Sequence, residues 1–152
     1  MVSPVETLTV QTLTINEEIR VKAPLDVTFA ALLEELGPLH QVADDRPLPM
    51  KLEARPGGRW YRDLGQDNGH LWGHVQAIKR PALLEISGPL MISYASNSNL
   101  QYRLTHENGV TLIAFRHTMI GLIPEDHRSG ASKGWAYSHE RVRKAAEQAA
   151  RV

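Results

Sequence analysis

The chain contains no cysteine, which excludes disulfide bonds, thiol catalysis and thiolate metal ligands. It also carries no net charge, because 17 Lys and Arg balance 17 Asp and Glu among 152 residues. Without a basic patch, nucleic acid is not expected as a partner. The apolar runs are short and interrupted, so we expect no membrane span. The first residues lack the basic start and apolar core of a secretory signal. These absences favour one cytoplasmic domain over residues 1–152.

The first third of the chain is predicted to contain a strand and one or two short helices. Residues 8–22 have a strand pattern, and the pair Glu17-Glu18, which interrupts its apolar face, is interpreted as a bulge. Ala23-Pro24 opens a helix, because proline is tolerated in the first turn, and Gly37-Pro38 ends it. Residues 39–45 are a candidate for a second short helix, and a loop follows at 46–49.

A run of strands joined by short turns follows. The strands are expected at residues 50–54, 59–64, 70–78, 83–87 and 99–106. Asn108-Gly109 is a strong hairpin signal into a last strand over 110–119. Alternate side chains of a strand share a face. The apolar face of this last strand therefore consists of Thr111, Ile113, Phe115, His117 and Met119.

The C-terminal part is predicted to be a loop and one long helix. The loop, residues 121–134, contains several glycines and is either an ordinary solvated loop or a gate beside a cavity. The helix begins at about Trp135. Its apolar stripe comprises Trp135, Ser138, His139, Val142, Ala145, Ala146 and Ala149. His139 lies near the middle of this stripe.

The order of elements predicts an α+β protein: a curved antiparallel sheet of about six or seven strands around a long C-terminal helix. The three alanines of the helical stripe leave room for a cavity between helix and sheet.

Four stretches of the sequence match the motifs of a known family. Residues 24–29 read Pro-x-x-Val-x-aromatic, residues 55–60 contain an Arg-x-Gly-Gly turn before an aromatic strand, and residues 73–75, with Pro81 and Leu83, match a Gly-x-Val strand and its following turn. The last stretch supplies Thr111, Phe115, His117, Gly121, Gly134 and Trp135. Over about residues 13–150 the chain resembles the helix-grip fold of the START-like (SRPBCC) superfamily, and specifically its branch of activator-of-heat-shock-90-ATPase homologues.

The resemblance implies a small single-domain protein that binds an apolar ligand in its cavity or contacts other proteins. The chain departs from the family pattern in three respects. Its second helix lacks the usual tryptophan, His139 stands where an apolar residue is common, and the large N-terminal domain of the chaperone co-activators is not present. The last difference argues against direct activation of a chaperone.

The predicted lining of the cavity consists of Trp60, Tyr102, Phe115, His117, Trp135 and His139. The two histidines are either ordinary interior residues bonded to neighbouring polar groups or polar handles for a ligand. The facing of Trp72 is left undetermined. His70 and His74 are expected to share a solvated strand face. The chain has no His-x-x-x-His motif in a predicted helix and no Glu-x-x-His motif, so neither a metal nor another cofactor is predicted.

Binding of a hydrophobic small molecule is therefore the first functional hypothesis. The alternatives are a cyclase, isomerase or hydrolase that uses one of the histidines, and a chaperone-linked interaction module. A homodimer is compatible with each. No nucleophile stands at a defined spacing from a second catalytic group, so the binding protein is preferred.

Overall fold

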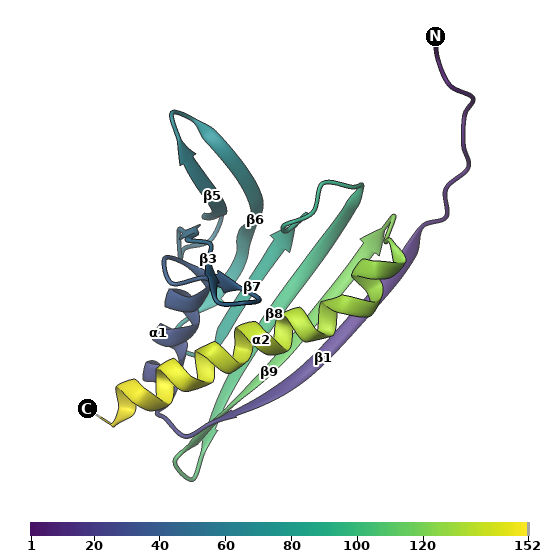
Figure 1. The fold of residues 1–152 in the computed structure, drawn as a ribbon. Coiled ribbons are helices and arrows are strands. Elements are labelled where there is room, and N and C mark those ends of the chain that lie inside the picture. Colours follow the sequence, from purple (N-terminus) through teal and green to yellow (C-terminus); the bar gives the residue numbers. More distant parts are fainter. Residues whose placement is uncertain (152) are drawn as a thin grey trace.

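The structure is a computed structural model that describes residues 1–151. Its elements in chain order are β1 (Gln11–Val21), α1 (Leu25–Leu36), β2 (Gln41–Val42), β3 (Arg46–Pro47), β4 (Lys51–Leu52), β5 (Arg59–Gly65), β6 (Asn68–Lys79), β7 (Leu83–Gly88), β8 (Ser96–Glu107), β9 (Val110–Gly121) and α2 (Glu125–Ala150). Figure 1 shows α2 crossing the strands obliquely, with α1 beside its C-terminal half.

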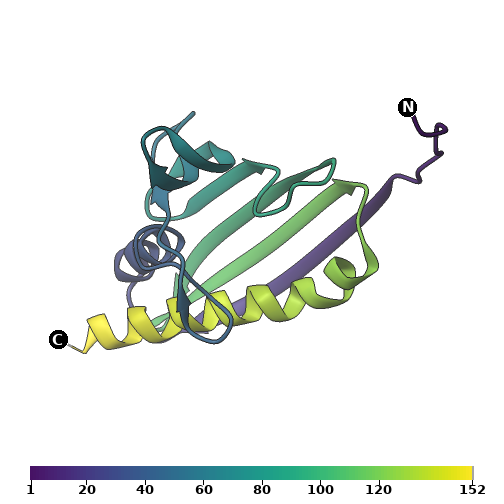
Figure 2. The same cartoon turned by 45° about the horizontal axis from the view of Figure 1, so that its top comes forward.

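One seven-stranded antiparallel sheet carries the fold, with the strand order β1-β9-β8-β7-β6-β5-β4. The strands from β4 to β9 form a meander, and β1 pairs with β9 at the far edge. The predicted α+β class, the antiparallel sheet and the long C-terminal helix are confirmed. In Figure 2 the sheet curves behind α2, which lies along its open side.

The bulge predicted at Glu17-Glu18 is wrong. The pairing of β1 with β9 runs without interruption from Gln11 to Val21, and Glu17 lies opposite Phe115. Glu17 therefore faces the interior with the apolar residues of β1. It can do so because its carboxylate meets His139 of α2, a contact that no local pattern reveals.

The predicted short helix at residues 39–45 is wrong as well. This segment forms the two-stranded β2–β3 hairpin, and the predicted loop at 46–49 contains β3. The turn depends on Asp44 and Asp45, which adopt φ angles of 67° and 55°. Aspartate tolerates this left-handed region better than most residues. His40 ties the base of the hairpin to Leu48 through its backbone carbonyl.

The helix α2 begins ten residues earlier than predicted, so the long loop predicted over residues 121–134 is wrong, and with it the alternative that this loop is a gate. Pro124 precedes its first turn, which contains Glu125 and Asp126. A proline, Pro24, likewise precedes the first turn of α1. Acidic residues in a first turn stabilise a helix, because they interact favourably with the positive end of its dipole. Because glycine is a weak helix former, Gly130 and Gly134 favoured the prediction of a loop. Packing of the 26-residue helix overrides that preference.

The apolar faces are arranged as predicted in most places. All five predicted inward residues of β9 are buried. In α2, the predicted stripe is buried at His139, Val142 and Ala146 but exposed at Ala149. No helix within residues 1–151 is long and apolar enough to cross a membrane.

Polar contacts hold the C-terminal half of α2 in place. Arg141 approaches buried Glu35 of α1, with 2.8 Å between Nε and Oε1. Burial raises the pKa of the Glu35 carboxyl, and Arg141 partly offsets that rise. Glu147 accepts a hydrogen bond from the backbone N–H of Lys22 at 3.0 Å. The N-terminal half of α2 lies away from α1 and runs along the sheet (Figure 2).

Candidate binding cavity

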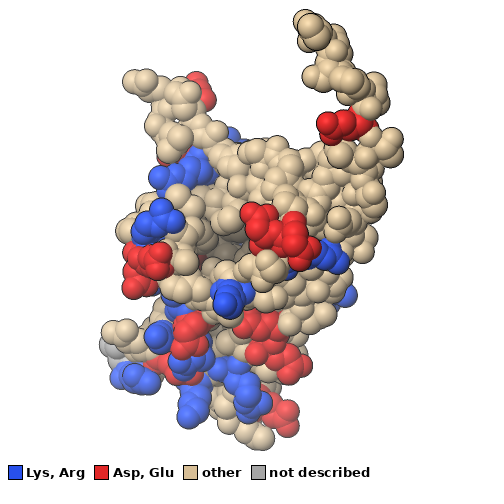
Figure 3. Space-filling model, turned by 45° about the vertical axis from the view of Figure 1, so that its right-hand side comes forward, with Lys and Arg blue, Asp and Glu red and all other residues tan. Residues whose placement is uncertain are grey.

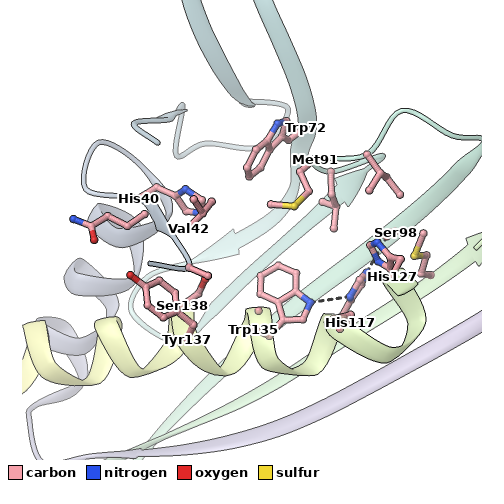
Figure 4. A pocket seen from close by; sticks show the side chains of 18 of the residues that line it. His40, Val42, Trp72, Met91, Ser98, His117, His127, Trp135, Tyr137 and Ser138 are labelled. Carbon is pink, nitrogen blue, oxygen red and sulfur yellow. Dashed lines mark hydrogen bonds between the residues drawn. The ribbon is translucent and has the colours of Figure 1, made fainter. Parts of the chain in front are cut away.

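A cavity of about 440 Å³ lies between the N-terminal half of α2 and the concave face of the sheet. Its walls come from α2, the β2–β3 hairpin, β5, β6, the segment after β7, β8 and β9. Figure 4 shows lining side chains from these elements pointing toward one another, and Figure 3 shows a recess in the surface between charged side chains of both signs. The lining is mostly apolar, with a few polar groups.

All three tryptophans of the chain, Trp60, Trp72 and Trp135, line this cavity. Each indole N–H already has an acceptor within the protein. Trp60 donates to the carbonyl of Leu36 at 2.8 Å, and so satisfies a backbone group at the end of α1. Trp72 donates to Nδ1 of His70 at 3.2 Å. With their donors used, the indoles contribute mainly aromatic surface, and Trp60 and Trp72 meet edge to face with 5.0 Å between ring centroids.

Small residues on one face of α2 make room for the cavity. Gly130, Ala131 and Gly134 line it together with Trp135. A Cβ atom added at Gly130 or Gly134 would meet no atom within 4 Å. The sequence contains a signal for this face, because Gly130 and Gly134 are four residues apart and each precedes another lining residue. The low helix propensity of the two glycines outweighed this signal in the prediction of a loop.

His117 is the middle member of a short hydrogen-bond chain at the cavity wall. Trp135 donates its Nε1–H to Nδ1 of His117 at 3.0 Å, and Nε2 of His117 lies 2.9 Å from Oγ of Ser98. The dashed lines in Figure 4 mark this chain. Burial lowers the pKa of His117 to about 4, and the neighbouring His127 adds to the effect. His117 is therefore neutral near pH 7. Protonation would place a hydrogen on Nδ1, which could then no longer accept the hydrogen bond from Trp135.

His139 belongs to a second chain, which lies behind the cavity wall. Its Nδ1 is 2.5 Å from Oε1 of Glu17, and its Nε2 is 3.0 Å from the hydroxyl of Tyr102. Tyr102 is fully buried, and burial together with Glu17 raises the pKa of its hydroxyl. The Trp135 ring stacks on His139 with an interplanar angle of 14°. The arrangement resembles a carboxylate–imidazole–hydroxyl relay, but its hydroxyl end is enclosed.

The six predicted lining residues divide into two groups. Trp60, His117 and Trp135 line the cavity. Phe115, Tyr102 and His139 do not line it; they form the layer behind it. Phe115 contacts both groups: its ring centroid lies 4.9 Å from that of Trp135 and 4.4 Å from that of His139.

Trp72 faces the cavity because of a register shift between β5 and β6. Trp60 pairs with Gly73 but Tyr61 pairs with Leu71, so Trp72 is an extra residue in β6. The shift also separates His70 from His74. His70 is half-buried beside Trp72, whereas His74 is exposed, so the prediction that the two share a solvated face is wrong.

Several polar lining residues were not found from the sequence. His40, Gln41 and His127 line the cavity, and so does Ser98. Oε1 of Gln41 and Nε2 of His127 are buried without a hydrogen-bond partner. Buried polar atoms without a hydrogen-bond partner are uncommon in proteins, so a bound molecule that bonds to them is favoured. Within residues 1–151, no three His, Asp or Glu side chains converge in a way that would hold a metal ion.

Comparisons with known proteins found no matching family model and no matching curated protein. Solved structures do match. An uncharacterised protein from Rhizobium leguminosarum superposes with a TM-score of 0.71 and 20% identity, over 92% of this chain and 97% of that one. Ara h 8.0201 gives a TM-score of 0.63 and 12% identity, over 90% and 98%. The di-domain ARO/CYC StfQ from the steffimycin biosynthetic pathway gives 0.64 and 12%, over 93% of this chain and 52% of StfQ.

The chain has the helix-grip fold. Its structural neighbours are helix-grip proteins of the SRPBCC and Bet v1-like type, and identities of this size establish the fold alone. The helix-grip fold commonly binds hydrophobic ligands.

Proposed function

We propose that this helix-grip protein binds a small, largely apolar aromatic molecule in the cavity beneath the first half of α2. The observation that carries the proposal is the lining: about 440 Å³ of space bounded by all three tryptophans of the chain. That volume lies within the range of about 300–1,000 Å³ that small-molecule sites occupy.

The chemistry of the walls supports an aromatic ligand. The indole N–H groups of Trp60, Trp72 and Trp135 are bonded within the protein, so these residues offer ring surface for stacking. Orphaned atoms of Gln41 and His127 add two points where a polar substituent of the ligand would find a partner.

The hydrogen-bond directions give no support to the alternative of a hydrolase, cyclase or isomerase that uses an interior histidine. Trp135 can only donate, so Nδ1 of His117 is an acceptor and the neutral ring carries its hydrogen on Nε2. His117 therefore donates to Ser98, which is the reverse of the bond that activates a serine nucleophile. The relay through His139 ends at Tyr102, which is fully buried and does not line the cavity.

Two substitutions in the same helix test the binding proposal. Gly134→Leu places a side chain where a Cβ atom meets open space at the cavity. Ala136→Leu places the same side chain at an exposed position of α2 that does not line the cavity. We would titrate each protein with 2-ethylnaphthalene and follow tryptophan fluorescence, which reports on the cavity directly.

Binding is expected in the wild type and in Ala136→Leu and is expected to be lost in Gly134→Leu. Replacement of a helical glycine by leucine should also stabilise α2 by about 0.5–1 kcal/mol. Lost binding in a variant that melts no earlier than the wild type cannot be attributed to unfolding. Equal binding in both variants, or no binding to the wild type, would contradict the proposal.

Three finer assignments are also proposals. The branch of activator-of-heat-shock-90-ATPase homologues is supported by the four motif stretches between residues 24 and 135. The cytoplasmic location and contacts with a second copy or a chaperone stay predictions from the sequence.

A further inference from the structure

The hydroxyl of Ser98 has one hydrogen atom, and the surrounding bonds determine where it can go. Trp135 donates to Nδ1 of His117 at 3.0 Å. A neutral imidazole has one N–H, so the hydrogen of His117 is on Nε2 and is donated to Oγ of Ser98 at 2.9 Å. Ser98 therefore accepts from His117 and cannot donate to it.

No other acceptor for this hydrogen exists among the described residues. Ser98 is only 2% exposed, and its side chain forms no hydrogen bond within residues 1–151 except the one with His117. It lines the cavity (Figure 4). A buried hydroxyl that lacks an acceptor loses about 1–3 kcal/mol of solvation, so a ligand atom that accepts from it is favoured.

We propose that Ser98 donates a hydrogen bond to an oxygen atom of the bound aromatic ligand, so that the site selects aromatic molecules with a carbonyl, ether or phenolic oxygen. The inference rests on the proposed binding function and adds the substituent and its contact residue. A hydrocarbon has no acceptor to offer, and a protonated amine has only donors.

Ser96 provides a matched control for Ser98. It lies two residues earlier on β8, so both side chains point to the same face of the sheet. Its Oγ is buried without a hydrogen-bond partner, but Ser96 does not line the cavity. Loss of either hydroxyl changes the interior by one atom, and only one of the two changes the cavity wall.

The experiment compares two probes of nearly equal shape, 2-acetylnaphthalene and 2-ethylnaphthalene, on the wild type, Ser98→Ala and Ser96→Ala. Loss of one neutral hydrogen bond predicts that Ser98→Ala binds the ketone about five- to tenfold more weakly. Its affinity for 2-ethylnaphthalene should stay within about twofold of the wild type, and Ser96→Ala should match the wild type for both probes.

The outcomes separate the inference from the proposed function. Unchanged ketone affinity in Ser98→Ala, or an equal loss for both probes, would overturn the role of Ser98 while leaving the cavity a binding site. Failure of the wild type to bind either probe would overturn the proposed function itself.

A second measurement on the wild type needs no variant. The infrared carbonyl band of bound, 13C-labelled 2-acetylnaphthalene should shift to lower frequency than in an alkane, because a hydrogen bond weakens the C=O bond. A band at the alkane position would overturn the inference.

Discussion

His117 and His139 are both interior histidines, with 2% and 1% of their surface exposed, yet their hydrogen-bond chains end in different places. The chain through His117 runs from Trp135 to the cavity-lining hydroxyl of Ser98. The chain through His139 runs from enclosed Tyr102 to the half-buried carboxylate of Glu17. Burial alone does not distinguish the two residues; their partners do.

The difference assigns separate roles to the two regions. The His139 chain satisfies all its members within the protein, so it serves the packing of α2 on β1 and β8. The His117 chain leaves one hydroxyl hydrogen for a molecule in the cavity. Trp135 belongs to both regions, because it donates to His117 and stacks on His139.

The largest effect on stability is expected from His139→Leu. The substitution removes the partners of Tyr102 and Glu17 together, so the free energy of unfolding should fall by about 3–4 kcal/mol in denaturant melts. The triple variant Glu17→Leu, Tyr102→Phe, His139→Leu should recover most of the loss. A single variant as stable as the wild type would show that the relay contributes nothing.

Two substitutions of Trp135 separate its contacts: one removes its contacts with both His117 and His139, and the other removes only the hydrogen bond to His117. Trp135→Ala should cost about 3 kcal/mol, because a large aromatic ring that packs on Phe115 and His139 is lost. Trp135→Phe keeps a ring over His139 but removes the bond to His117, which predicts a loss of about 1 kcal/mol. Chemical denaturation measures both variants, and equal losses would mean that the ring contributes no packing energy.

Acidification should weaken the His117 region. The folded protein holds the pKa of His117 at about 4, against an ordinary value of 6.5. The unfolded chain therefore takes up a proton first as the pH falls. The resulting stabilisation is complete above about pH 6.5, declines below it and is absent below about pH 4, with a size of about 3 kcal/mol.

Melts of the wild type and His117→Gln at pH 7.5, 5.5 and 4.5 check this prediction. The stability difference between the two proteins should shrink as the pH falls. His40, whose pKa burial also lowers, titrates in both proteins and therefore cancels in that difference. Parallel curves would contradict the assignment of His117 as a buried neutral ring.

The sequence predicted much of the fold because alternation along a strand is a local property. Side chains two residues apart share a face, so the inward row from Thr111 to Met119 followed from the order of residues alone. The hairpin at Asn108-Gly109 and the helix start at Pro24 followed from local backbone preferences. These rules operate within a few residues.

The errors arose where contacts between distant segments override local preference. The early start of α2 depends on packing that tolerates Gly130 and Gly134 in a helix. The facing of Trp72, which the sequence left undetermined, depends on a one-residue shift between β5 and β6. A bulge changes which side chains point inward without leaving a distinctive pattern in the chain.

The sequence by itself therefore determined the class of fold, the inward faces of the main strands and the presence of two histidines in the interior. Only the tertiary structure decided what each histidine does. The carboxylate that meets His139 is 122 residues away in the chain, and the indole that sets the tautomer of His117 comes from a different element. Hydrogen bonds depend on distances of about 3 Å between atoms, and the pattern of residues along a chain does not specify such distances across it.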